Sequence, residues 1–460
     1  MGCLRRSDSK GVFKMSRKHT LAWFLFGLGS QLQIIASLSF TELFVFAAAP
    51  FIFLREKDYM KQNGIMPFFW LSLLVVVGCV VACIANHTKP LFVLRGMAVT
   101  CLLPSVVVVG HWMLRRDMGG FKWFLIGTAI SSVLCTFVFQ RSVEVTMLAS
   151  GEAGKGAVDA IMSGPIYWIG RLNDVLRSIP EGWYLQCPTF VAAGIPLFMA
   201  GFSMLTSVSG RSAALGAIGT VAILLICGKK RETIRRRLCN KFGLWCCVAI
   251  VGIFCIHTLY RVSATQGWLG EEALRKYETQ TRGDTEIMAL LIGGRMESFC
   301  GLIACVDKPV IGFGPWAEDR DGYINEFLQK YASVDSYNEY LKWMEYYNDM
   351  GMDVTKMIPA HSCITQFWLW YGIFGLIFWV YVIFVFIRYI RQDCWVVPQW
   401  FMWIAASIPA YMWSMLFSPW ADRIGGIVFI VACLMARAVR LGVQPLPDYM
   451  EEEIFKVESK

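Results

Sequence analysis

The stretch that decides the fold runs from residue 357 to residue 386 and reads MIPAHSCITQFWLWYGIFGLIFWVYVIFVF. It is apolar almost throughout once its single histidine, His361, has been passed. A run of about 20 apolar residues is long enough to cross a hydrocarbon core of roughly 30 Å. The stretch therefore predicts a membrane-spanning segment with a titratable ring at its start.

Runs of this kind recur along the whole chain of 460 residues, 56% of which are hydrophobic. They predict an all-α polytopic membrane protein. The candidate spans are residues 21–38, 40–54, 66–85, 91–113, 121–139, 189–208, 212–228, 242–260, 362–388, 398–417 and 425–441.

The basic residues predict the orientation of these spans. The formal net charge is +9, and the cations cluster beside apolar runs in the connectors REKDYMK, LRRD, KKRETIRRRLCNK and RYIRQD. That clustering is typical of the positive-inside rule and argues against binding to nucleic acid. The densest connector, residues 229–241, is therefore predicted to be cytoplasmic.

Counting spans from that connector divides the chain into five parts. They are a cytoplasmic tail (1–20), transmembrane helices (21–260), a large extracytoplasmic loop (261–361), C-terminal transmembrane helices (362–441) and a second cytoplasmic tail (442–460). The count from the N-terminus falls short by one crossing. Either the weaker segment 157–170 crosses or re-enters the membrane, or one of the N-terminal spans is wrong, and we favour a crossing by 157–170. The prediction is then about twelve transmembrane helices with both termini inside.

The large loop contains an aromatic segment, residues 323–349, with rings at helical spacing. Two interpretations remain open. The aromatic face packs on the membrane surface or on the helices below, or it covers a sugar site.

The 16 cysteines show no metal-ligand spacing, so no metal and no cofactor are predicted. An oxidising compartment would allow a disulfide among Cys187, Cys300, Cys305 and Cys363.

Three residues are candidates for chemistry. Arg211 lies between two apolar spans and either anchors a turn at the interface or binds phosphate oxygens with its planar guanidinium. Arg295 either binds a substrate or pairs with a nearby carboxylate such as Glu297. His361 is either a structural ring at the start of a helix or a general base, because a neutral imidazole accepts a proton near pH 7. Its neighbour Ser362 is a candidate cap of that helix.

Three further residues are supporting candidates. Glu297 follows Arg295 closely, Arg141 lies two residues after the span 121–139, and His257 ends the span 242–260 on the same side as His361. The sequence Gly312-Phe313-Gly314 lacks the third glycine of a dinucleotide fingerprint and is interpreted as a backbone turn.

Three motifs occur in an order that resembles the bacterial O-antigen ligase and O-antigen polymerase family. SVSGRSA (207–213) resembles the Ser-Arg-Gly turn of that family, and GGRMESFCGLIACVDKPVIGFGP (293–315) resembles its Gly-Arg helix followed by a Pro-x-x-Gly-x-Gly turn. PAHSCITQFWLWYGIFGLIFWV (359–380) resembles its outer-face His-Asn and Gly-x-x-Gly helix. The chain departs from the pattern at Gly210, at Ser362 in place of asparagine and at Phe299 in place of tryptophan.

The resemblance implies a GT-C-like helical bundle in the bacterial inner membrane, working in polysaccharide and lipopolysaccharide biosynthesis. It implies metal-independent, inverting transfer of a glycan from an undecaprenyl-diphosphate donor to a lipid, glycan or protein acceptor on the periplasmic side. His361 would be the base, and Arg211 and Arg295 would bind the diphosphate. The alternatives are a polymerase of the same family and, from another class, a transporter of lipid-linked sugars or anions, against which the lack of an internal repeat counts.

Overall fold

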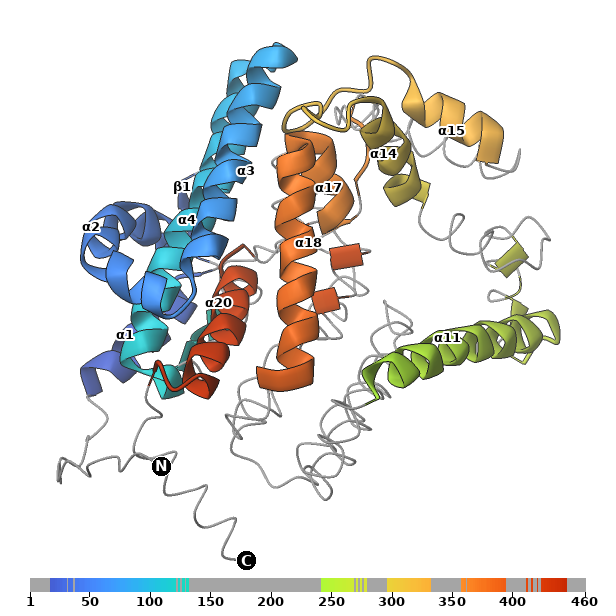
Figure 1. The fold of residues 1–460 in the computed structure, drawn as a ribbon. Coiled ribbons are helices and arrows are strands. Elements are labelled where there is room, and N and C mark those ends of the chain that lie inside the picture. The colour runs from blue at the N-terminus through green and yellow to red at the C-terminus, as the bar shows by residue number, and fades with distance from the viewer. Residues whose placement is uncertain are drawn as a thin grey trace, which may run out of the picture.

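The computed structural model describes residues 17–30, 32–35, 38–120, 123–124, 126–128, 130–131, 241–268, 270–271, 274, 277–278, 296–331, 357–360, 362–393, 411–412, 415–416, 420 and 423–444. These residues are mostly helical (Figure 1). The elements are α1 (Arg17–Leu28), β1 (Gln33–Ile35), β2 (Leu38–Ser39), α2 (Phe40–Gln62), α3 (Met66–Ala85), α4 (Pro90–Arg116), η1 (Met118–Gly120), α11 (Phe242–Thr265), α14 (Met296–Asp307), α15 (Tyr323–Tyr331), α17 (Cys363–Tyr371), α18 (Ile373–Arg388), η3 (Tyr389–Asp393) and α20 (Arg423–Arg440).

Three helices in this part of the chain are long and apolar enough to cross a membrane. They are Met66–Ala85, Pro90–Arg116 and Ile373–Asp393. This indicates a membrane protein, as the sequence predicts. The helices α11 and α20 match the predicted segments 242–260 and 425–441 closely, although their crossing of a membrane stays a prediction. The segments 157–170, 189–208 and 212–228 lie outside the described residues, as do most of 121–139 and 398–417.

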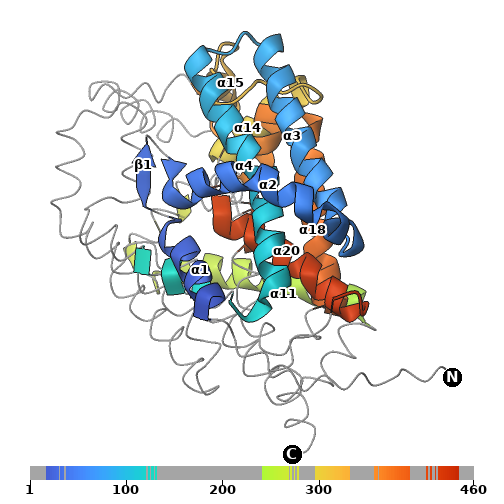
Figure 2. The same ribbon diagram turned by 90° about the vertical axis from the view of Figure 1, so that its left-hand side faces the viewer.

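The core forms where α3, α4, α18 and α20 pack together (Figures 1 and 2). The ring of Phe68 in α3 stacks on Phe378 in α18 at 5.4 Å between centroids. Residues 427 to 436 of α20 are all buried, which is typical of a helix enclosed on every side. In Figure 1, α20 lies between α4 and α18.

Basic connectors gather at one end of this bundle. Arg115, at the end of α4, forms a two-pronged ion pair with the buried Glu56 of α2, with N–O distances of 2.7 and 2.8 Å. At the same end, Nε2 of Gln444 donates to the carbonyl of Arg115 at 3.3 Å. Arg440 pairs with the fully buried Asp393 at 2.6 Å. The positive-inside rule predicts that this end is cytoplasmic.

The first predicted span, residues 21–38, is not one continuous helix. Helix α1 ends at Leu28, and a two-stranded antiparallel hairpin of β1 and β2 follows. The backbone of Gly29 accepts from the amide of Thr41 at 3.2 Å, and Ser39 opens α2 with a capping box to Glu42. A helix of 12 residues rises about 18 Å, which is short of a bilayer core of roughly 30 Å.

The predicted span 362–388 is also wrong as a single helix. Gly372 has a φ of 62°, which ends α17 after nine residues and starts α18 in a new direction. A Cβ on Gly375 would lie 2.2 Å from the carbonyl oxygen of Phe367, so this glycine lets α17 and α18 lie against each other (Figure 1). The Gly-x-x-Gly step is therefore the corner of a helical hairpin.

Candidate functional site

Most residues singled out in the sequence lie outside the described part of the chain. This holds for His361, Arg211, Arg295 and Arg141. The backbones of Glu297 and His257 lie in α14 and α11, but the structure does not describe their side chains. The structure does describe the segments next to Arg295 and His361. We call these segments, residues 296–315, 357–360 and 362–373, the frame.

The first part of the frame is the contact between α14 and the segment leading to His361. A Cβ on Gly301 would lie 2.5 Å from the carbonyl oxygen of Pro359, so only glycine permits this approach. One turn further on, the thiol of Cys305 lies 3.7 Å from the carbonyl oxygen of Thr365. Glu297 precedes Gly301 by four residues in α14.

The second part is the turn that follows α14. The amide of Phe313 donates to the carbonyl of Leu369 at 2.7 Å, and the amide of Gly314 donates to Trp370 at 3.1 Å. Gly312 and Gly314 have φ values of 74° and 85°, a region that favours glycine. The interpretation of this sequence as a backbone turn is confirmed. Two of the three family-like segments thus form one packed unit.

Ser362 confirms the predicted helix cap. Its hydroxyl oxygen accepts from the amide of Thr365 at 3.3 Å and donates to the carbonyl of Met415 at 2.9 Å. The side chain is buried, and α17 then runs for nine residues, about 13 Å, to the corner at Gly372. The start of α17 therefore lies inside the bundle, a helix length away from that corner.

The aromatic segment begins with α15, and the remainder of residues 323–349 lies outside the described part. The carboxylate of Asp319 accepts from the amides of Tyr323 and Ile324 at 2.8 and 3.0 Å and so caps this helix. Tyr323 and Phe327 are buried, and the Tyr323 ring meets Phe313 edge-on at 5.7 Å. Burial, followed by hydrogen bonding to Asp307, raises the pKa of Tyr323 above its usual value. These first rings pack inward on the protein.

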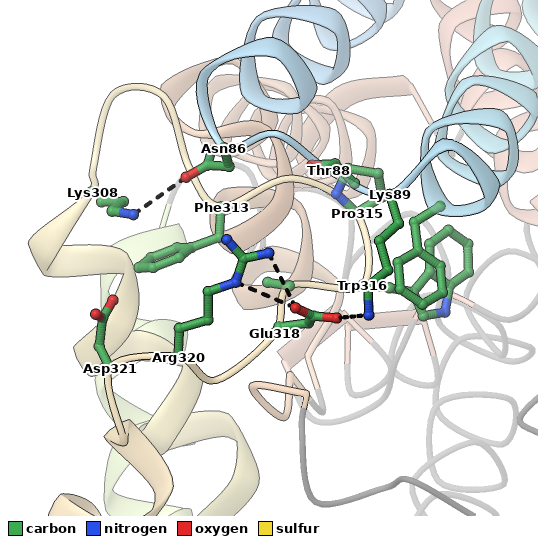
Figure 3. Close-up of a pocket in the computed structure, with 12 residues that line it drawn as sticks. Asn86, Thr88, Lys89, Lys308, Phe313, Pro315, Trp316, Glu318, Arg320 and Asp321 are labelled. Atoms are coloured by element: carbon green, nitrogen blue, oxygen red, sulfur yellow. Dashed lines mark hydrogen bonds and ion pairs between the residues drawn. The ribbon is translucent and has the colours of Figure 1, made fainter.

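A pocket lies at the end of the bundle where the α3–α4 loop meets the segment after α14 (Figure 3). Its cavity volume is about 60 Å³. The amide of Asn86 ties the two sides together: Nδ2 donates to the carbonyl of Gly312 at 3.0 Å, and Oδ1 accepts from Lys308 at 3.3 Å. Residues 86–89 and 308–321 therefore lie at the same end of the bundle.

Five charged side chains line this pocket: Lys89, Lys308, Glu318, Arg320 and Asp321. Glu318 pairs with Lys89 and with Arg320, the latter at 3.1 Å, as Figure 3 shows. The hydrogen bond from Lys89 is the main reason that the pKa of Glu318 is lowered from its usual 4.5, and Arg320 adds to the effect. The ammonium of Lys308 lies 4.4 Å from the centroid of the Phe313 ring.

An aromatic stack forms one wall of the pocket. Trp316 stacks on Trp370 at 4.8 Å and on Phe92 at 6.1 Å between centroids. The backbone of Trp316 has a φ of 53°, which is rare for a bulky residue and places its ring in this stack. Sequence reasoning missed this pocket, because no local pattern joins residues 86–92 to residues 308–321.

Among the described residues, no disulfide joins Cys300, Cys305 and Cys363, all three of which are buried. Cys187 lies outside the described residues. Burial raises the pKa of both Cys300 and Cys305 to about 12. Within the part of the chain that the structure describes, no group of three or more His, Cys, Asp or Glu side chains could hold a metal ion.

No protein-family model matches the chain, and no curated protein matches it either.

Proposed function

We propose that this chain is an O-antigen ligase-like glycosyltransferase of the bacterial inner membrane. It would move a glycan from an undecaprenyl-diphosphate donor to an acceptor hydroxyl on the periplasmic side, without a metal and with inversion. The observation that carries the proposal is the packing of α14 and its following turn onto residues 357–373, which brings two of the three family-like segments together.

The chemistry follows from three residues. The acceptor oxygen attacks the anomeric carbon while the bond from that carbon to the donor phosphate breaks, and the diphosphate leaves with the electron pair. His361 takes the proton of the acceptor hydroxyl. Arg211 and Arg295 neutralise the charge that grows on the leaving diphosphate.

The frame supports this assignment through backbone geometry. Gly301 lets α14 approach Pro359, two residues before His361, and Arg295 precedes the first residue of α14. A buried cap at Ser362 fixes the chain directly after His361. Glu297 and His257 remain supporting candidates, as does Arg141.

A transfer assay tests the proposal. Purified protein is incubated with a lipid-linked glycan donor and candidate lipid, glycan and protein acceptors, without added metal. His361→Ala and Arg295→Ala are each expected to lower kcat by at least about 100-fold. The matched controls are His19→Ala and Arg55→Ala, at exposed positions of α1 and α2. Unchanged transfer by His361→Ala and Arg295→Ala would show that neither residue has its proposed role.

The products separate a ligase from a polymerase. A ligase transfers one glycan to a different acceptor, whereas a polymerase of the same family returns longer chains on the lipid carrier. Gel separation of the products after a single addition of donor distinguishes the two.

One observation favours the transporter alternative. The apolar run 362–388 is broken at Gly372, and broken helices are common at transporter binding sites. Substrate-dependent flux into vesicles, without transfer to any acceptor, would favour that alternative.

A further inference from the structure

The pocket of Figure 3 holds a cation that the proposed reaction does not use. Lys89 and Arg320 share the carboxylate of Glu318. Lys308 has no carboxylate partner among the residues that the structure describes, because its ammonium bonds to the neutral amide of Asn86 and lies over the ring of Phe313. Among the described residues, Lys308 is therefore a pocket-lining cation without a carboxylate partner.

Exposed apolar side chains flank this lysine. Val306, Val310 and Ile311 are 64%, 60% and 42% exposed. A lysine within an apolar strip can lay its methylene stem along lipid acyl chains while its ammonium stays at the lipid headgroups. The strip lies at the end of a bundle whose helices α3 and α4 are long enough to cross a membrane.

We propose that this pocket binds the phosphate headgroup of an anionic glycerophospholipid, with the acyl chains lying over Val306, Val310 and Ile311. The ammonium of Lys308 is the first cation to bind the phosphate, because a lysine binds phosphate as a point charge. The apolar strip selects a phosphate carried on a lipid over a soluble one. This binding does not depend on glycosyl transfer and is measured without turnover.

Glu318 weakens the binding of phosphate by this pocket. Its carboxylate neutralises Lys89 and Arg320, so a phosphate that enters the pocket competes with Glu318 for the same two cations. Without the charge of Glu318, the described residues that line the pocket would present three cations to the phosphate and one other carboxylate, Asp321. The proposal therefore predicts opposite effects for two neighbouring charge removals.

The test is calorimetric titration of the full-length protein in a neutral detergent. The probes are dioctanoyl phosphatidic acid, dioctanoyl phosphatidylcholine, dioctanoyl glycerol and inorganic phosphate. Phosphatidic acid is expected to bind about tenfold more tightly than each of the other three. Equal binding of phosphatidylcholine or dioctanoyl glycerol would overturn the proposal, and equal binding of inorganic phosphate would overturn the lipid as its ligand.

Charge-changing variants test whether phosphatidic acid binds in this pocket. Lys308→Gln is expected to weaken phosphatidic acid binding roughly fivefold, and Lys308→Arg should keep it. The matched control is Lys57→Gln, which removes one charge from an exposed position of α2. Glu318→Gln is expected to tighten binding by a similar factor. If Lys308→Gln behaved like Lys57→Gln, or if Glu318→Gln weakened binding, the proposal would be wrong.

Discussion

The amide of Phe313 donates a 2.7 Å hydrogen bond to the carbonyl of Leu369, which joins the large predicted loop to the last turn of α17. Beside it, the amide of Ile373 donates to the carbonyl of Val310 at 3.0 Å. These bonds lie on either side of Gly372, so the turn after α14 and the corner of the α17–α18 hairpin support each other.

Gly372→Ala tests this mutual support. The substitution places a Cβ 2.0 Å from the carbonyl oxygen of Val310 and also requires a positive φ. A backbone at φ 62° and ψ −147° is adopted almost only by glycine, so its strain in alanine costs about 1–3 kcal/mol, and the clash adds to it. Thermal unfolding in detergent should show a clearly lower Tm than Gly64→Ala, because Gly64 has a φ of 70° but nothing within 4 Å. Equal Tm values would mean that the corner is not tightly packed.

Gly301→Ala tests the approach of α14 to the segment before His361. Alanine favours a helix over glycine by about 1 kcal/mol, so helix propensity alone would stabilise the variant. The new Cβ would instead lie 2.5 Å from the carbonyl oxygen of Pro359 and displace that segment. If His361 is the base, kcat should fall at least about tenfold. Gly252→Ala in α11, with nothing within 4 Å, is the control and should keep its activity.

The pH dependence of transfer tests His361 as a base. An imidazole with a usual pKa near 6.5 is neutral above that pH and protonated below it. For the wild type, kcat should therefore fall about tenfold per pH unit below about pH 6. His361→Ala should have a low kcat without this acidic limb. A variant that kept the limb would assign it to another group, with His257 as the first candidate.

Glu318 gives a pH dependence of stability with a definite sign. Lys89, followed by Arg320, lowers the pKa of Glu318 below its usual 4.5, so these ion pairs stabilise the fold above that pH. The stabilisation is lost as the pH falls through the lowered pKa. The difference in Tm between wild type and Glu318→Gln should therefore be largest near pH 6 and shrink below about pH 4. A difference that stayed constant with pH would show that the carboxylate charge is not involved.

The bounds of α3 and α4 were predicted within a few residues because each segment is mostly apolar over at least 20 residues and ends at a polar connector. The cap at Ser362 was predicted for the same local reason, since serine before an apolar run is a helix start. The predicted spans 21–38 and 362–388 failed at glycines. Gly29 and Gly372 are nearly neutral in hydropathy, so an average over 20 residues does not register the change in backbone direction.

The pocket could not be predicted, because its partners come from segments more than 200 residues apart. Hydrophobic periodicity and capping are local signals, whereas the bonds from Asn86 to Gly312 and Lys308 depend on how helices pack. The proposed catalytic residues were identified by resemblance to a family and not by periodicity or capping. Their order along the chain resembles a family pattern, and the structure describes the segments beside two of them.

The side of the membrane on which this pocket lies decides whether the proposed chemistry can occur. The Asn86 contacts place the α3–α4 loop and the segment 308–321 at one end of the bundle, and the connectors with Arg115 and Arg440 gather at the other. Gly64 and Gly322 are turns with nothing within 4 Å, so each should accept an inserted alkaline phosphatase reporter in the full chain. The positive-inside rule predicts an active reporter at Gly322 and an inactive one at Gly64. The reverse result would place the large loop in the cytoplasm and exclude transfer from a periplasmic donor.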